Sequence, residues 1–392
     1  MTGWTLWKFP FFDASHYELA ERVAAWTTDE FHEEPRPEQL AGISRDMALS
    51  LGKAGLLDCV LPKRDAKGHW TIDVRSICLV REGIGYRSGL ADSVVAMQGL
   101  GTAAIWMHGT PEQQEKYLEP ARRGEKIAGL ALTEPTSGSD VANITTSAVR
   151  DGDHYVINGE KAFITNGNFA DHFIVYARTG EAPGARGLTG FIVDAGTPGL
   201  IQGEPMDMMA PHPLAPLTFR DCRVPASNVI GTPGNGFKVA MSTFDIFRPT
   251  VGAATIGMAG RALHAVLERV HERNLFGGPM ADLAGVQSRI ADMTIDLEMG
   301  ALAVYRAAWA RDTMGGRCTK EASLAKFVGT ENAGRIVDNA VQIFGGLGVT
   351  RGSIVEHLYR EVRASRIYEG ASEVQKLVIA RQVLADYKAA RQ

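Results

Sequence analysis

Four long helical patterns occupy the C-terminal part of the chain, and they constrain its fold more than any other feature. Apolar residues recur there at steps of three and four, as in Leu263, Val266 and Val270, which is the periodicity of an amphipathic α-helix. Such helices with short connections favour a four-helix bundle, because each must bury an apolar stripe against its neighbours. The predicted helices span residues 237–273, 283–312, 320–345 and 351–388.

The middle of the chain has the pattern of short β-strands instead. Two β-prone runs flank Asn158-Gly159, and this dipeptide predicts a β-hairpin. Further short runs separated by Gly, Pro and Asp are typical of a small barrel or sandwich. Upstream, five or six helices are predicted, one of them starting at Thr110-Pro111, a cap followed by proline in the first turn.

The predicted fold class is therefore multi-domain α+β, without the βαβ alternation of a nucleotide-binding Rossmann fold. A chain of 392 residues is too long for one core. We expect an N-terminal α-helical domain, a middle β domain and a C-terminal helical bundle, at residues 1–128, 129–236 and 237–392.

Composition excludes several classes of function. The net charge is -4 and no block of five or six like charges occurs, so nucleic acid is not an expected partner. The four cysteines and ten histidines lack metal-ligand spacing, so no metal site is expected. No 18-residue apolar run or signal peptide is evident, so we expect a cytoplasmic protein with reduced thiols and no membrane association.

Two segments of the middle region have the residues to hold a flat heterocycle. The loop Leu132–Asp140 offers hydroxyl groups and many main-chain amides, which suit a ring edge or a pyrophosphate; a polar domain linker is the alternative. Phe163 and Thr165 end a predicted strand two residues apart, and that spacing places them on one face, able to stack on a ring and to hydrogen-bond with it. An ordinary strand end is the alternative there.

The third segment is Tyr368-Glu369-Gly370, which lies just ahead of a helical pattern. A carboxylate projecting into an apolar cleft has a raised pKa, which suits a general base. Ser372 and Gln375 have the spacing of a capping box, so a solvated carboxylate near a helix start is the alternative for Glu369. The Gly-rich run at 345–348 follows a predicted helix, so it is not a nicotinamide-dinucleotide motif.

Together these motifs resemble the flavin-dependent acyl-CoA dehydrogenases over nearly the whole chain. The matching segments are Leu132–Asp140, Phe163–Gly167, Gln342–Gly348 with Arg360-Glu361, and Tyr368–Gly370. The resemblance implies FAD as cofactor and Glu369 as the base that removes the α-proton of an acyl-CoA thioester. The main-chain N–H of Glu369 would help to hold the thioester oxygen, and FAD N5 would accept the hydride.

The resemblance also assigns binding residues and partners. Electrons would pass to an electron-transfer flavoprotein, and an FAD site shared between subunits implies a homo-oligomer, usually a tetramer. Arg273, Phe276, Gln342, Gly345 and Gly346 would reach the FAD of a neighbouring subunit. The expected cofactor-binding residues also include Leu132, Thr133, Ser139, Phe163, Thr165 and Glu373. The expected substrate-binding residues are Ser139, Asp245, Arg248 and Gly370.

Some positions depart from the family pattern, and some questions stay open. Phe163 replaces a frequent Trp, and Ala371 stands where Thr is common. An acyl-CoA oxidase, a flavin monooxygenase and a non-catalytic flavin- or acyl-CoA-binding protein are the alternative functions. The acyl group is expected to be alicyclic, branched or short, and either CoA or an acyl carrier protein would carry it.

Overall fold

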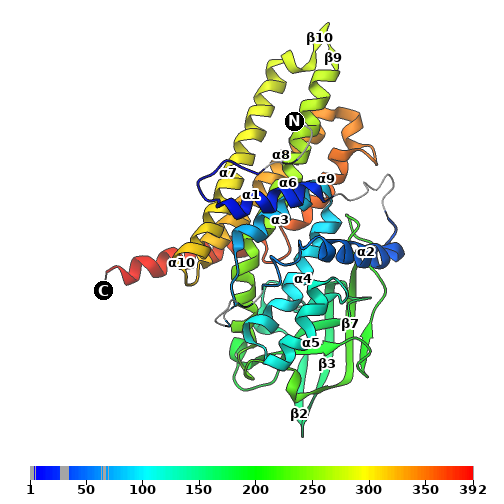
Figure 1. Ribbon diagram of the computed structural model, residues 1–392, viewed down its shortest axis with the longest axis vertical. Helices are drawn as coiled ribbons and strands as arrows, with labels where there is room; N and C mark the ends of the chain where they lie inside the picture. Colours follow the sequence, from blue (N-terminus) through cyan, green and yellow to red (C-terminus); the bar gives the residue numbers. More distant parts are fainter. Residues whose placement is uncertain are drawn as a thin grey trace. The chain divides into compact units, whose positions relative to one another are not determined.

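The computed structural model describes residues 4, 6–26, 35–62, 64, 68 and 70–391. They belong to two compact units. The first combines Met1–Glu34, Asp73–Asp92 and Asp245–Gln392, and the second combines Pro35–Ile72 and Ser93–Phe244. Helices precede and follow a block of strands along the chain (Figure 1), which confirms the predicted fold class. The division at 128/129 and 236/237 stays a prediction.

Five helices precede the strands. The start predicted at Thr110 is confirmed, because Gln113 N–H donates to Thr110 Oγ1 at 3.3 Å while Thr110 N–H donates to Gln113 Oε1 at 3.0 Å. Asp73 caps another helix by accepting from the N–H groups of Arg75 and Ser76. The helices are α1 (Ala14–Ala25), α2 (Leu40–Lys53), α3 (Val74–Arg87), α4 (Gly89–His108) and α5 (Pro111–Arg122).

The middle region forms an eight-stranded sheet of order β6-β7-β3-β2-β4-β5-β8, with β1 paired to β4. Within this unit α5 and the later part of α4 lie beside the sheet (Figure 1), and Gln98 of α4 accepts from Ala128 N–H of β1 at 2.9 Å. The strands are β1 (Ala128–Ala131), β2 (Ser147–Asp151), β3 (His154–Thr165), β4 (His172–Arg178), β5 (Leu188–Asp194), β6 (Leu200–Gln202), β7 (Leu214–Pro225) and β8 (Val229–Ile230).

The hairpin predicted at Asn158-Gly159 is wrong. Strand β3 runs through both residues, and its pairing with β7 shifts register between Ile157 and Gly159. Gly159 has φ +145°, and a Cβ there would lie 2.7 Å from Thr146 Cα, so glycine serves a bulge and a close approach of backbones. The turn lies instead at Gly152 (φ +63°), between β2 and β3.

The C-terminal region contains five helices where four were predicted. The pattern at 351–388 is interrupted after Ser365, and the next helix starts at Ser372. Glu369 and Gly370 between them have φ +52° and +93°, which no α-helix accommodates. The helices are α6 (Gly236–Glu272), α7 (Ala284–Met314), α8 (Thr319–Phe344), α9 (Ile354–Ser365) and α10 (Ser372–Ala389), with β9 (Asn274–Leu275) and β10 (Gly278–Pro279) forming a small hairpin after α6.

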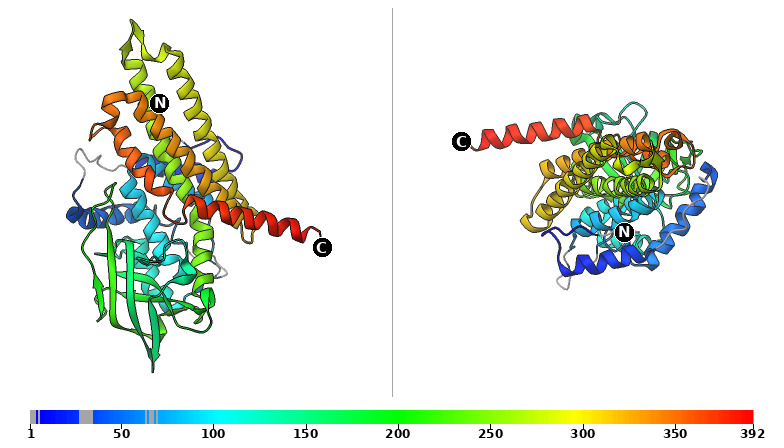
Figure 2. Two further views of the ribbon diagram at one scale, coloured as in Figure 1. Left: turned by 180° about the vertical axis from the view of Figure 1, so that it is seen from behind. Right: turned by 90° about the horizontal axis from the view of Figure 1, so that it is seen from above.

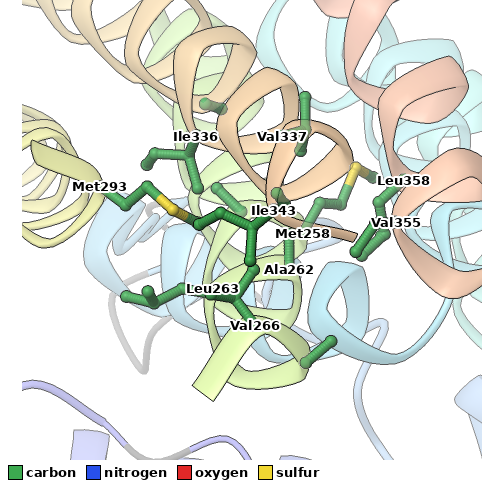
Figure 3. Close-up of a cluster of buried hydrophobic side chains, with 14 of the residues drawn as sticks. Met258, Ala262, Leu263, Val266, Met293, Ile336, Val337, Ile343, Val355 and Leu358 are labelled. Atoms are coloured by element: carbon green, nitrogen blue, oxygen red, sulfur yellow. The ribbon is translucent and has the colours of Figure 1, made fainter. Parts of the chain in front are cut away.

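One apolar core holds α6 to α9 together. Side chains from these four helices interdigitate in it, as Figure 3 shows, and Met293 of α7 reaches toward Ile336 and Ile343 of α8. Gly252 of α6 and Gly329 of α8 allow a close crossing, since a Cβ on Gly329 would lie 2.7 Å from Gly252 Cα. Both views in Figure 2 show α10 extending away from the other helices of this unit.

The aromatic N-terminal segment packs on helices of its own unit. Trp4 and Trp7 donate their indole N–H groups to Glu82 Oε1 of α3 at 3.0 and 2.9 Å. Tyr305 of α7 donates to the other oxygen of Glu82 at 2.6 Å, and the Phe12 ring meets the Tyr305 ring edge-on at 4.8 Å. The aromatic residues therefore cover a buried carboxylate, whose pKa burial raises to about 7.

Short 3₁₀ segments connect several of these elements. They are η1 (Pro37–Gln39), η2 (Val141–Asn143), η3 (Gly184–Gly187), η4 (Ala226–Asn228), η5 (Met280–Asp282) and η6 (Gly345–Val349).

Candidate active site

Glu369 lies in the turn between α9 and α10, and the turn holds it in a left-handed conformation. Ser372 N–H donates to Arg366 C=O at 3.1 Å and closes the turn. The capping box predicted for Ser372 and Gln375 is wrong: Ala371 is the N-cap, and the Ser372 hydroxyl donates to Glu331 of α8. A non-glycine residue at positive φ is strained, and such strain concentrates at functional sites.

The Glu369 carboxylate is placed as a general base requires. The residue is partly exposed, but its Oε2 atom is buried and has no hydrogen-bond partner in the part of the chain that the structure describes. Burial raises the pKa of Glu369 to about 7. Its main-chain N–H also donates no hydrogen bond among the described residues, so one residue offers both an unpartnered carboxylate oxygen and an unpartnered amide.

Charged groups from four helices act on this carboxylate. Arg81 is the cation that opposes the raised pKa of Glu369 most strongly, and Asp92 reinforces the rise. Arg81 and Asp92 are themselves a buried pair, with Nε–Oδ1 and Nη2–Oδ2 distances of 2.8 and 2.7 Å, and Arg81 Nη1 donates to Thr250 Oγ1 at 2.8 Å. Burial is the largest influence on Glu369 and outweighs these cations, so its pKa stays raised.

Two predicted substrate-binding residues, Asp245 and Arg248, lie in the same unit as Glu369. They form a buried pair on α6 with an Nη1–Oδ1 distance of 3.4 Å, and Asp245 also accepts from Thr319 at 3.1 Å and pairs with Arg317 at 2.8 Å. Arg248 acts on the Glu369 carboxylate as a further cation, and burial lowers its own pKa. The structure thus brings Asp245, Arg248, Glu369 and Gly370 together.

The second unit groups the residues expected to contact a flavin ring. Ala162 N–H donates to Thr133 C=O at 2.9 Å, which holds the loop after β1 beside the end of β3. Phe163 is 55% exposed, whereas Leu132 is buried and Thr133 and Thr165 are half-buried. Phe163 has φ +56° at a bulge, so local twist, rather than simple alternation along the strand, sets its direction.

These residues fit a bound isoalloxazine. The hydroxyls of Thr133 and Thr165 make no hydrogen bond within the described part of the chain, and the neighbouring Phe163 ring is exposed. Hydroxyls free to donate and accept, next to an uncovered aromatic face, suit the polar edge of a flat heterocycle.

A buried ion pair braces that loop. Lys161 Nζ donates to Leu132 C=O at 3.0 Å and to Glu134 Oε1 at 2.9 Å. Glu134 also accepts from the N–H groups of Thr145 and Thr146 at 2.6 and 2.9 Å, and its pKa is lowered to about 2 by Lys161 and these donors, against the effect of burial. The pair therefore fixes the main chain on both sides of Thr133.

The remaining predicted site residues are exposed. Ser139 lies on the exposed part of the loop that begins at Leu132. Phe276 is 95% exposed at the tip of the β9–β10 hairpin. Leu275 of this hairpin packs on the same core as Ile343 and Phe344, so the hairpin and the Gly-rich turn lie at one end of the bundle. Arg273, Gln342, Gly345, Gly346 and Glu373 are also exposed.

Three charged residues near Glu369 are absent from the sequence-based prediction: Arg81, Asp92 and Lys326. Lys326 is fully buried on α8 and its Nζ donates to Gly370 C=O at 2.8 Å. The sequence pattern could have identified Lys326, because the spacing of Ala322, Lys326 and Gly329 places them on one apolar face of a helix. A buried lysine on such a face is rare without a partner.

The described residues include neither a metal-binding cluster nor a membrane-spanning helix. No cluster of three or more His, Cys, Asp or Glu side chains has metal-binding geometry among them. Within the same residues, no helix has the length and hydropathy needed to cross a bilayer.

Comparison with known proteins gives matches along nearly the whole chain. Models described as the N-terminal, middle and C-terminal domains of acyl-CoA dehydrogenase match residues 13–125, 129–222 and 234–384.

Individual relatives give the same result. The short-chain specific acyl-CoA dehydrogenase of Megasphaera elsdenii is 38% identical over 85% of this chain and 87% of its own. The acryloyl-CoA reductase (NADH) of Anaerotignum propionicum is 38% identical over 85% of each. The solved structure of butyryl-CoA dehydrogenase from Megasphaera elsdenii is 31% identical and superposes with a TM-score of 0.84, covering 95% of this chain and 99% of that one.

Proposed function

Because the chain belongs to the acyl-CoA dehydrogenase family, we propose that it oxidises an acyl-CoA thioester to the 2-enoyl-CoA, with Glu369 as the base. The protein is an oxidoreductase and FAD is its cofactor. The observation that carries the assignment of the base is the buried, unpartnered Oε2 atom of Glu369, whose carboxyl has a pKa of about 7. A base whose pKa lies near the working pH combines a useful ionised fraction with a strong proton affinity.

The chain's own groups account for the proton half of the reaction. The ionised Glu369 carboxylate takes the α-proton onto Oε2, to which none of the described residues donates a hydrogen bond. The unpartnered N–H of Glu369 donates to the thioester oxygen, and this hydrogen bond makes the α-proton more acidic. Burial of the carboxylate oxygen keeps water from competing for it.

Residues of the second unit bind and orient the cofactor. When bound, FAD supplies the acceptor for the hydride that leaves the β-carbon. Thr133 and Thr165 would hydrogen-bond the ring edge and Phe163 would pack on the ring, and the Lys161–Glu134 pair holds the loop that carries Thr133. The exposed Phe276 and the open Gly345-Gly346 turn would contact FAD bound to a neighbouring subunit. The electron acceptor is an electron-transfer flavoprotein, as the family resemblance implies.

The reverse reaction is a second candidate. A carboxyl with a pKa of about 7 is partly protonated at neutral pH and can return a proton to the α-carbon. The acryloyl-CoA reductase (NADH) relative is as similar to this chain as the short-chain dehydrogenase is. Reduction of a 2-enoyl-CoA would use the same residues in the same places.

The first experiment is anaerobic mixing of the purified yellow protein with straight-chain, branched and alicyclic acyl-CoAs. Bleaching of the oxidised-flavin absorbance by one of them establishes the dehydrogenase reaction and its acyl group. Oxidation of the pre-reduced protein by a 2-enoyl-CoA tests the reductase direction. Peroxide formed in air would identify an oxidase instead, and a flavin spectrum that no thioester changes would favour a non-catalytic binding protein.

Glu369→Gln tests the base. We expect this variant to retain FAD, because Glu369 lies in a different unit from Thr133 and Thr165, and to lose flavin reduction by at least about 10³-fold. Reduction within tenfold of the unaltered protein would overturn the assignment.

A further inference from the structure

The strained turn that carries Glu369 is held by a clamp on two main-chain carbonyls. Lys326 Nζ donates to Gly370 C=O at 2.8 Å. Gln375 Nε2 donates to the same oxygen at 2.9 Å and to Glu369 C=O at 3.3 Å. Both donors are fully buried, so water cannot replace them at these carbonyls.

Lys326 is held in place by the packing of its own helix. Gly329, three residues further along α8, meets Gly252 of α6 at a close crossing. Thr330 Oγ1 donates to Lys326 C=O at 2.9 Å. The position of the ammonium group is therefore fixed by the helix bundle, whereas the turn that it contacts has little regular structure of its own.

A structural role alone leaves the lysine unexplained. A neutral donor such as Gln375 already serves the Gly370 carbonyl, and a buried ammonium group is costly unless a negative charge faces it. Glu369 is the negative charge that acts on Lys326 most strongly. The charge of Lys326 therefore acts on the carboxylate of the turn whose main chain the lysine also holds.

We propose that Lys326 is a positioning residue for Glu369: its ammonium group fixes the Glu369-Gly370 turn through the Gly370 carbonyl and is one of the cations that favour the ionised form of the Glu369 carboxylate. The inference rests on the proposed function, since it assigns a partner to the proposed base. No contact between Lys326 and the substrate is required.

The charged groups around Glu369 and Lys326 determine in which direction the pKa of Glu369 changes when the lysine is replaced. Cations favour the ionised form of Glu369 and therefore oppose the rise in its pKa, while Asp92 reinforces it. The groups that act on Glu369 are Arg81 from α3, Asp92 from α4, Arg248 from α6 and Lys326 from α8. Burial lowers the pKa of Lys326 to about 8, opposed by Glu369, Glu331 and Glu373. Removal of the Lys326 charge therefore raises the pKa of Glu369.

The test is the pH dependence of kcat/KM in FAD-loaded protein. In Lys326→Met, we expect the acid limb to move to higher pH by about one unit and kcat to fall at every pH. Lys326→Gln, which loses the charge but keeps a hydrogen-bond donor, must also shift the acid limb of kcat/KM to higher pH. Lys326→Arg keeps the cation and must leave the limb in place. Lys320→Met, at the partly exposed start of α8 where Lys320 pairs with Asp386, is the matched control.

The outcomes separate the two proposals. An acid limb within about 0.2 units of the unaltered protein in both Lys326→Met and Lys326→Gln overturns the role of Lys326 while leaving Glu369 as the base. Undiminished flavin reduction in Glu369→Gln overturns the proposed function itself. If Lys326→Met does not accumulate as a yellow protein, the contrast between Lys326→Gln and Lys326→Arg decides the question.

Discussion

At the scale of single residues, burial raises the pKa of two carboxyl groups in the first unit, Glu369 and Glu82. Both have a pKa of about 7, and desolvation is the main cause in each. They differ in their partners. Three donors satisfy Glu82, whereas Oε2 of Glu369 has no partner among the described residues. The satisfied carboxyl is structural, and the unsatisfied one is the candidate for chemistry.

Glu82 predicts a pH dependence of stability. Its pKa is raised in the folded protein, so the proton that it binds stabilises the fold below the unfolded pKa of about 4.5, and this stabilisation is lost as pH rises through about 7. The expected loss is up to about 3 kcal/mol in the free energy of unfolding. Glu82→Gln should remove this pH-dependent part of the free energy of unfolding. The fold should tolerate the change, since an amide accepts from both tryptophans and donates to the Tyr305 hydroxyl.

The measurement compares the unfolding of Glu82→Gln and the unaltered protein in urea at pH 5 and pH 8. The difference in free energy between the two proteins should change with pH in favour of the variant at pH 8. An equal difference at both pH values would contradict the structural assignment of Glu82.

At the scale of elements, backbone conformation decides where strands turn and where helices stop. The Asn158-Gly159 dipeptide lies inside β3, at a register shift against β7. Asn158 Nδ2 donates to Asp221 Oδ1 at 3.1 Å, and the main-chain N–H of Asp221 donates to Asn158 Oδ1 at 2.8 Å. The break between α9 and α10 likewise depends on residues at positive φ. In both places contacts with a segment distant in sequence, rather than the local sequence pattern, set the conformation.

Two glycines of this sheet give a matched pair of substitutions. Gly152→Ala should cost about 1 kcal/mol, because φ is +63° but nothing lies within 4 Å of the added Cβ. Gly159→Ala should cost about 3 kcal/mol or more, since its Cβ would also meet Thr146 at 2.7 Å. Urea unfolding of the two variants measures both losses of stability. Equal losses would contradict the assignment of an open turn at Gly152 and a crowded bulge at Gly159.

At the scale of the whole molecule, several apolar side chains are exposed and could be covered in the proposed homo-oligomer. Phe276 is 95% exposed at a hairpin tip, and Leu384 and Tyr387 are 68% and 63% exposed on α10. Apolar groups left uncovered in this number favour an interface. A homo-oligomer with an FAD site shared between subunits, as proposed for this family member, gives them partners.

Phe276→Ser should weaken FAD retention and association without unfolding the subunit. Light scattering would report the mass relative to one 42.3 kDa chain, and the ratio of flavin to protein absorbance would report retention. Val149→Ser, which alters an apolar residue 65% exposed on β2, is the control and should change neither. A monomer that holds FAD as well as the unaltered protein would contradict the shared site.

The order of helices and strands could be predicted from the sequence alone, and so could Glu369, Thr133, Phe163 and Thr165 as site candidates. Periodicity and capping are local properties, and the motifs are short and contiguous, so both are legible in a linear chain. The start of α5 at Thr110-Pro111 is one such case, because the donors and acceptors of a cap lie within three residues of each other.

The surroundings of the base depend on the tertiary structure. Arg81, Asp92, Arg248 and Lys326 come from four different helices, all of them distant in sequence from Glu369, and their effect on Glu369 depends on distance and burial, which no local pattern encodes. The same holds for the left-handed turn at Glu369 and Gly370, where Lys326 and Gln375 donate hydrogen bonds to the Gly370 carbonyl. The residues of the site are a property of the sequence, and their charge states and conformations are a property of the fold.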